Sequence, residues 1–193
     1  MDFFAGVLGW AVIAEPGGSF SGWGGDRLAA QVVAGEQGWS VFFGGDESRE
    51  LAGNSSVDGG RVLHGPWAPP PRAGEPCWVE LATASPEDGY WCAELGWESR
   101  EAAEDLVVFT SARHGDARAV AGRLRTSDGD GWRPFFAVDD LDGAVARVSE
   151  LDGRVLREPT TVPTGRSALI EGPHGGCCVL LEKPAGWGGA WAS

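Results

Sequence analysis

The chain has 193 residues, with 15 Lys and Arg against 28 Asp and Glu, so its formal net charge is −13. This balance argues against a nucleic acid or a membrane as partner, because clustered Lys and Arg drive binding to phosphate groups. Hydrophobic residues make up 42% of the chain, which is enough for a packed core and excludes wholesale disorder. Ten tryptophans against one tyrosine predict large rigid surfaces that are either buried or used to bind a ligand.

The first residues of the chain and its cysteines indicate where in the cell the protein is located. The apolar stretch over residues 3–14 is too short to span a bilayer, and Asp2 stands where a signal peptide would carry positive charge. The four cysteines show no zinc-binding spacing, and two of them are adjacent, which rules out an ordinary bridge between that pair. We therefore expect a cytoplasmic protein that needs no cofactor.

The first half of the chain gives only weak indications of its secondary structure. A helix is predicted over Phe3–Gly9, and no strand precedes it. A second helix is predicted over Asp46–Gly59, although Leu51 is all that remains of its apolar stripe. The proline-rich stretch 67–76 predicts a semi-rigid linker, because proline fixes φ and removes a hydrogen-bond donor.

The second half of the chain gives stronger indications of its secondary structure. Apolar and polar residues alternate over Cys77–Ala84, which predicts a half-buried strand. Ser85 is expected to cap a helix that ends at Gly96, and an apolar stripe over Leu141–Leu151 predicts another helix that stops at Gly153. Further strands are predicted over residues 105–109, 117–125, 132–138, 155–156, 167–170 and 177–181. The order is one strand, one helix and three strands, repeated.

The chain also repeats itself on a larger scale. Gly38–Phe43 resembles Gly131–Phe136, which begins 93 residues later, and the same offset relates Gly60–Leu63 to Gly153–Leu156. We therefore predict two related halves, the first of which lacks strands that the second keeps. The predicted divisions are a truncated domain over 1–66, a linker over 67–76, a complete domain of two modules over 77–183, and a Gly/Trp tail over 184–193.

Repeated strand–helix–three-strand modules with a helix ending in Gly-Trp resemble the vicinal oxygen chelate (VOC) superfamily, which includes glyoxalase I, bleomycin-resistance proteins and extradiol dioxygenases. The resemblance covers the second half best, through Trp78–Thr83, Phe135–Asp140 and the turn Gly172–Gly175. The first half is similar to a truncated copy, as in tandem-domain members from actinomycetes. The resemblance implies an α+β fold of tandem βαβββ modules that form curled mixed sheets.

The resemblance further implies where catalytic members hold a divalent metal. Their ligands are His, Gln or Glu side chains at the starts of the first strands, together with a Glu in the last strand. At these positions the chain has Trp39, Trp78, Trp132 and Val179. Neither an indole nor a valine offers a lone pair, so we expect no metal in the usual site. A displaced set drawn from Glu80, Glu182 and the three histidines would need several coincidences.

In the family these side chains point into the cup of the curled sheet, which leaves two interpretations of the tryptophans. They fill the cup as inert core, which suits Trp39 best, or Trp78 and Trp132 flank a slot for a flat apolar ligand. Glu80 would then supply a counter-charge for a cationic compound. The predicted ligand-binding residues are Trp39, Trp78, Glu80, Trp132, Phe136 and Val179.

Three functions follow as hypotheses, and no catalytic residue is predicted. The favoured one is a metal-free binding protein of the glyoxalase/bleomycin-resistance type that sequesters an aromatic or hydrophobic compound, such as a natural product. The first alternative is a VOC-type lyase, isomerase, cyclase or dioxygenase with displaced metal ligands or no metal. The second alternative is a structural or assembly protein with a filled cup. The missing strands of the first half also predict a homodimer, because they would leave unpaired edges.

Overall fold

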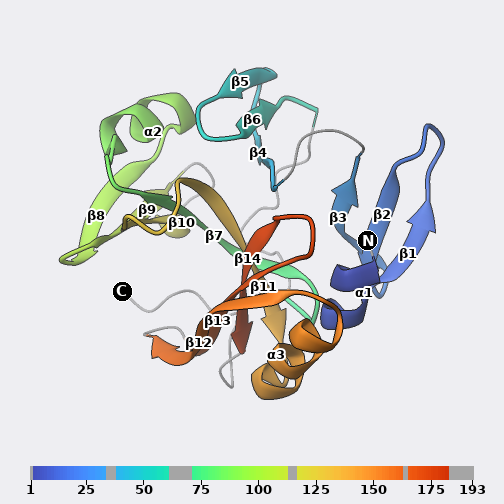
Figure 1. Cartoon of the computed structure of the whole chain (residues 1–193). Helices are drawn as coiled ribbons and strands as arrows, with labels where there is room; N and C mark the ends of the chain where they lie inside the picture. Colours follow the sequence, from blue (N-terminus) through green and yellow to red (C-terminus); the bar gives the residue numbers. More distant parts are fainter. Residues whose placement is uncertain (1, 34–37, 61–70, 113–116, 163–164, 183–193) are drawn as a thin grey trace. The chain divides into compact units, whose positions relative to one another are not determined.

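The second half of the chain forms the order strand, helix and three strands twice, in a computed structural model that describes residues 2–33, 38–60, 71–112, 117–162 and 165–182 (Figure 1). The first copy comprises β7 (Pro76–Thr83), α2 (Asp88–Leu95), β8 (Glu98–Ala103), β9 (Leu106–Ser111) and β10 (Arg118–Arg125). The second comprises β11 (Gly131–Val138), α3 (Leu141–Glu150), β12 (Arg154–Val162), β13 (Gly165–Glu171) and β14 (Cys177–Glu182). These two copies confirm the predicted α+β fold of tandem βαβββ modules.

In the described residues of the first half the chain forms one helix and two small sheets. Its elements are α1 (Asp2–Leu8), β1 (Ala11–Ala14), β2 (Phe20–Gly24), β3 (Arg27–Val32), β4 (Val41–Gly44), β5 (Arg49–Leu51) and β6 (Ser55–Asp58). The order β1-β2-β3 is antiparallel, and in the order β4-β6-β5 strand β4 is parallel to β6. The helix predicted over Asp46–Gly59 is wrong, because Gly53 and Asn54 adopt positive φ values of 65° and 53° and turn β5 back onto β6.

The chain divides into two compact units, neither of which is continuous in sequence. Unit 1 comprises Met1–Gly38, Pro70–Cys77 and Phe135–Gly188, and unit 2 comprises Trp39–Pro69, Trp78–Pro134 and Gly189–Ser193. Strands β7 and β11 each run from one unit into the other. The domain boundaries predicted from the sequence stay a prediction, and residues 67–70 of the linker and the whole tail lie outside the described residues.

In unit 1 the core forms where α3 packs on its sheet. Strand β14 lies between β11, to which it is parallel, and β13, to which it is antiparallel. The apolar stripe of α3 buries Leu141, Ala144 and Val148, as its sequence predicts. Asp140 caps the helix, because its side chain accepts a hydrogen bond of 2.9 Å from the Gly143 amide.

Trp10 fixes the first residues of the chain within unit 1. Its Nε1 donates to the Gly74 carbonyl at 2.6 Å, and its ring meets that of Phe136 edge-on at 5.4 Å. A Cβ at Gly22 would lie 2.5 Å from the indole, so only glycine lets β2 approach this closely.

Glu75 is a buried carboxylate that two arginines hold within unit 1. One oxygen accepts from the Arg27 guanidinium at 2.8 Å, and the other accepts from the Arg72 guanidinium at 2.8 Å. Burial acts to raise the pKa of Glu75, but the hydrogen bonds and charges of the two arginines outweigh it and hold the pKa below its usual value. The ionised carboxylate therefore stabilises the folded chain.

Glu75→Gln is expected to remove a pH-dependent part of the stability. Because the folded pKa is depressed, the contribution is present above the unfolded pKa of about 4.3 and is lost as pH falls through the folded value. Urea unfolding of wild type and variant between pH 7 and pH 3 should show a stability difference that shrinks as pH falls. The exposed Glu158→Gln in β12 is the control, and a difference that stays constant with pH would contradict the prediction.

In unit 2 the strand order is β7-β10-β9-β8, and β7 is parallel to β10. Helix α2 ends as predicted at Gly96, which adopts φ 64°, and the Trp97 amide donates to the Cys92 carbonyl. The predicted cap at Ser85 is wrong: α2 begins three residues later, Glu87 is its N-cap residue, and the Ser85 amide donates to the Thr83 hydroxyl. The structure also adds β8, which is exposed along all six residues.

Candidate functional site

Trp78 and Glu80 lie side by side on β7, as expected for residues two apart in a strand. A Cβ at Gly122 of β10 would lie 3.3 Å from Trp78 Nε1 and 3.4 Å from Glu80 Oε2. Glu80 is in register with Gly122 across the parallel pair, so both side chains rest on the bare backbone of β10. Both side chains are partly exposed. An indole and a carboxylate are thus presented together on one face of the sheet.

Trp132 lies in a different environment, the aromatic core of unit 2. Its ring is 4.9 Å from Trp91 and 5.1 Å from Phe43, and both contacts are edge-on. Leu81 belongs to the same buried cluster, which partly buried Val79 packs against. Because side chains alternate along a strand, Trp132 packs on the side of β7 that faces α2, whereas Trp78 and Glu80 occupy the other side. This geometry does not support a slot flanked by both tryptophans.

Of the other three predicted residues, one belongs to unit 2 and two belong to unit 1. Trp39 is half-buried and precedes β4 in unit 2. Phe136 and Val179 are both buried in unit 1, where Phe136 meets the Trp10 ring and Val179 pairs with Phe135. Within unit 2 the structure therefore joins only Trp78 and Glu80 of the predicted set. The ligand-binding role of all six residues stays a prediction.

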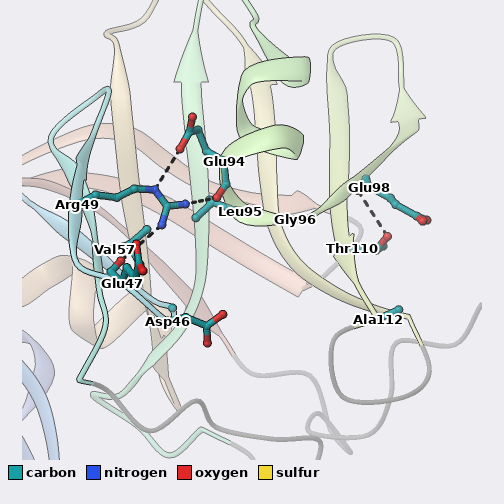
Figure 2. Close-up of a pocket in the computed structure, with 12 residues that line it drawn as sticks. Asp46, Glu47, Arg49, Val57, Glu94, Leu95, Gly96, Glu98, Thr110 and Ala112 are labelled. Atoms are coloured by element: carbon teal, nitrogen blue, oxygen red, sulfur yellow. Dashed lines mark hydrogen bonds and ion pairs between the residues drawn. The ribbon is translucent and has the colours of Figure 1, made fainter.

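Unit 2 also contains a pocket of about 680 Å³ that includes none of the predicted residues (Figure 2). Its lining residues are Gly44, Gly45, Asp46, Glu47, Arg49, Val57, Glu94, Leu95, Gly96, Glu98, Thr110 and Ala112. Arg49 Nε donates to Glu94 Oε2 at 3.1 Å, and its guanidinium also binds the Glu94 carbonyl. This pair ties β5 to α2 across 45 residues of sequence. Its distance in sequence explains why no local motif predicted it.

The residues present do not fit the metal of the catalytic family members. Indole and valine side chains occupy the expected ligand positions and offer no donor. In the described part of the chain no group of three or more His, Cys, Asp or Glu is placed to hold a metal ion. Of the displaced set, Glu182 accepts hydrogen bonds from Arg166 and the Leu141 amide. His64 and His114 lie outside the described residues.

The thiols are poor candidates for nucleophiles. All four cysteines are free, and burial raises the pKa of both Cys77 and Cys178. The Cys77 thiol donates to the Phe135 carbonyl at 3.3 Å. Cys178 is fully buried in β14, and an electrostatic interaction with the neighbouring Cys177 raises its pKa further. Neither buried thiol therefore supplies a thiolate near neutral pH.

The fold is that of a protein of tandem βαβββ modules, and the comparison with known families gives the same class. The chain matches the model of the Glyoxalase/Bleomycin resistance protein/Dioxygenase superfamily over residues 1–176. The chain therefore belongs to this superfamily, as the sequence resemblance implied.

Curated relatives include proteins from actinomycetes. The chain is 28% identical to the anthracycline biosynthesis protein DnrV of Streptomyces peucetius, in a match covering 79% of this chain and 70% of that protein. It is 31% identical to the anthracycline biosynthesis protein DauV of Streptomyces sp. (strain C5), covering 54% and 40% respectively. A shorter match, 40% identical over 55 residues, joins it to the putative glyoxylase CFP32 of Mycobacterium bovis, of which it covers 21%.

Solved structures show similar but distant chains. A methylmalonyl-CoA epimerase in complex with methylmalonyl-CoA is 17% identical, with a TM-score of 0.41, over 63% of this chain and all of that one. A superfamily member from Vibrio splendidus 12B01 is 16% identical, with a TM-score of 0.40, over 55% and 97%. Both scores are low, so the family assignment rests on the match to the family model.

Proposed function

We propose that the chain is a metal-free binding protein that sequesters an aromatic or hydrophobic small compound, such as a natural product, on the Trp78 and Glu80 face of unit 2. The observation that carries the proposal is the placement of these two side chains on Gly122. A partly exposed indole offers a flat apolar surface for stacking, and an adjacent carboxylate offers a charge to a protonated amine.

The replaced metal positions support binding over metal-dependent chemistry. The side chains there stack or pack, and they have no means of polarising a substrate oxygen. The names of DnrV and DauV also support the proposal, because both are anthracycline biosynthesis proteins and an anthracycline is a flat aromatic compound. We therefore take a flat aromatic natural product as the class of ligand to test first.

The remaining expectations about partners and location stay predictions. No helix within the described residues has the length and apolarity that crossing a membrane would require. We keep the homodimer, the cytoplasmic location and the absence of a nucleic-acid partner as proposals. Analytical ultracentrifugation over a concentration series tests the first, and a mass that stays monomeric would remove it.

Trp78→Ala is expected to weaken binding of a flat aromatic ligand by about tenfold, because a stacked aromatic pair contributes about 0.5–1.5 kcal/mol beyond area burial. Isothermal titration calorimetry with an anthracycline, and with 9-aminoacridine as a smaller flat cation, measures the change. The folded state should survive, because Trp78 is not part of the aromatic core cluster around Trp132.

Phe42→Ala is the matched control, because it removes an exposed aromatic ring from β4 of the same unit. Equal weakening by both substitutions, or no binding of either compound to wild type, would contradict the proposal. Product analysis by mass spectrometry on the same incubations separates the alternatives. A converted ligand would establish an enzyme in place of a binding protein.

A further inference from the structure

Gly122 lies inside β10, just after an irregularity in the pairing of β10 with β9 between Ala119 and Ala121, and its own φ does not require a glycine. It lies in β10, in register with Glu80 on one side and with Val108 on the other. Its φ lies outside the left-handed region that favours glycine. A glycine in a strand interior weakens the strand, since it has no side chain to pack and more entropy to lose on folding. A strand glycine marks either a bulge or a close approach of other groups, and at Gly122 the side chains beside it show such a close approach.

Those neighbours are the two side chains of the proposed site. A Cβ at position 122 would meet Trp78 Nε1 at 3.3 Å, Trp78 Cζ2 at 3.4 Å and Glu80 Oε2 at 3.4 Å. The polar edge of the indole and one carboxylate oxygen thus converge on a single point above the β10 backbone. A Cβ at that point would make tight contacts that require a shift of a few tenths of an ångström, and a larger side chain would displace the indole or the carboxylate further.

We propose that Gly122 is a positioning residue that sets the selectivity of the site for flat organic cations over neutral compounds of the same shape. This inference rests on the proposed function. Because Gly122 has no side chain, the Trp78 indole and the Glu80 carboxylate can both lie close over the backbone of β10. A ligand ring stacked on the indole then brings a cationic nitrogen close to the carboxylate.

The selectivity follows from the distance dependence of the charge interaction. A cation and a neutral compound of the same shape gain similar apolar stacking on Trp78, so the adjacent carboxylate is expected to account for most of the difference between their affinities. Coulomb attraction falls with distance, and it falls further as water enters between the charges. A larger residue at 122 therefore reduces the preference for the cation.

The test compares 9-aminoacridine, which is protonated at pH 7.5, with acridine, which is neutral there. Isothermal titration calorimetry of wild type should show about tenfold tighter binding of the cation. Gly122→Val should bring this ratio close to one, and Gly122→Ala should lower it two- to threefold. Gly89→Ala is the control, because a Cβ at Gly89 in α2 meets nothing within 4 Å and should leave the ratio unchanged.

A double substitution keeps the test valid if Gly122→Val fails to fold. In a Glu80→Gln background the ratio should already be close to one, and adding Gly122→Ala should change it no further. A packing role alone would lower the unfolding temperature and leave the ratio as in wild type. An unchanged ratio in the Gly122 variants, or equal affinity of wild type for both probes, overturns the role of Gly122 and leaves the proposed function standing. Failure of both probes to bind wild type overturns both.

Discussion

Asp88→Ala is expected to lower the free energy of unfolding by about 3 kcal/mol, at the lower end of the range for breaking a buried ion pair. Arg123 is 6% exposed, and its guanidinium binds Asp88 through two bonds of 2.9 and 2.7 Å. The hydrogen bonds that Arg123 donates to Asp88 raise the pKa of Arg123, so the guanidinium stays charged. Removing the carboxylate leaves a buried charge that, among the described residues, still donates to the Asp105 carbonyl and has the Asp105 and Glu101 carboxylates nearby.

Urea unfolding at neutral pH measures this loss, and Arg123→Met provides the control. The double variant Asp88→Ala, Arg123→Met should recover most of the stability, because an apolar chain of similar length replaces the unpaired charge. If Asp88→Ala alone costs less than about 1 kcal/mol, the pair behaves as a solvent-exposed one, which would contradict the burial of Arg123 between α2 and its sheet.

This ion pair also marks a limit of sequence analysis. The strands and helices with clear periodicity, such as β7 and α3, were predicted because burial of one face leaves a pattern in the sequence. Helix α2 was predicted too, but its first residue was wrong. Its start is set by contacts with other segments, and the bond between Asp88 and Arg123 joins residues 35 apart.

The elements that sequence analysis missed in the region around Gly53 and in β8 show no alternation of apolar and polar residues. Strand β8 is exposed along its whole length, so its sequence shows no alternation of apolar and polar residues. Strands β5 and β6 occupy three and four residues and are shaped by a turn at Gly53 and Asn54. A short segment of mixed polarity carries no period, and the repeat between the two halves wrongly suggested a helix there.

Sequence analysis predicted only part of the candidate site, because it detects local patterns and does not detect contacts between distant segments. Strand alternation placed Trp78 and Glu80 on one face, and the structure shows them there, over Gly122. The equivalence of Trp132 to Trp78 came from the repeat, which describes positions along the strand and says nothing of what packs around them. The aromatic partners of Trp132 come from β4 and α2, which no local pattern could place beside it.

Trp132→Ala is therefore expected to act on stability, with a loss of about 3–5 kcal/mol, as for other buried aromatic residues replaced by alanine. Trp132 is 5% exposed and packs edge-on against Phe43, Trp91 and Trp97. Truncation would open a cavity that three rigid rings cannot close. Chemical unfolding measures the loss, and Trp78→Ala should cost much less while weakening the ligand more.

Trp132→Phe separates the ring from its polar atom. The Trp132 Nε1 is buried with no hydrogen-bond partner among the described residues, and a buried unsatisfied donor costs about 1–3 kcal/mol. Phenylalanine keeps an aromatic ring and removes that donor, so we expect a net loss of about 1 kcal/mol or less. If Trp132→Ala instead keeps full stability and loses ligand binding, Trp132 would contact the ligand. The slot between the two tryptophans would then be restored, and the packing of Trp132 against α2 would be wrong.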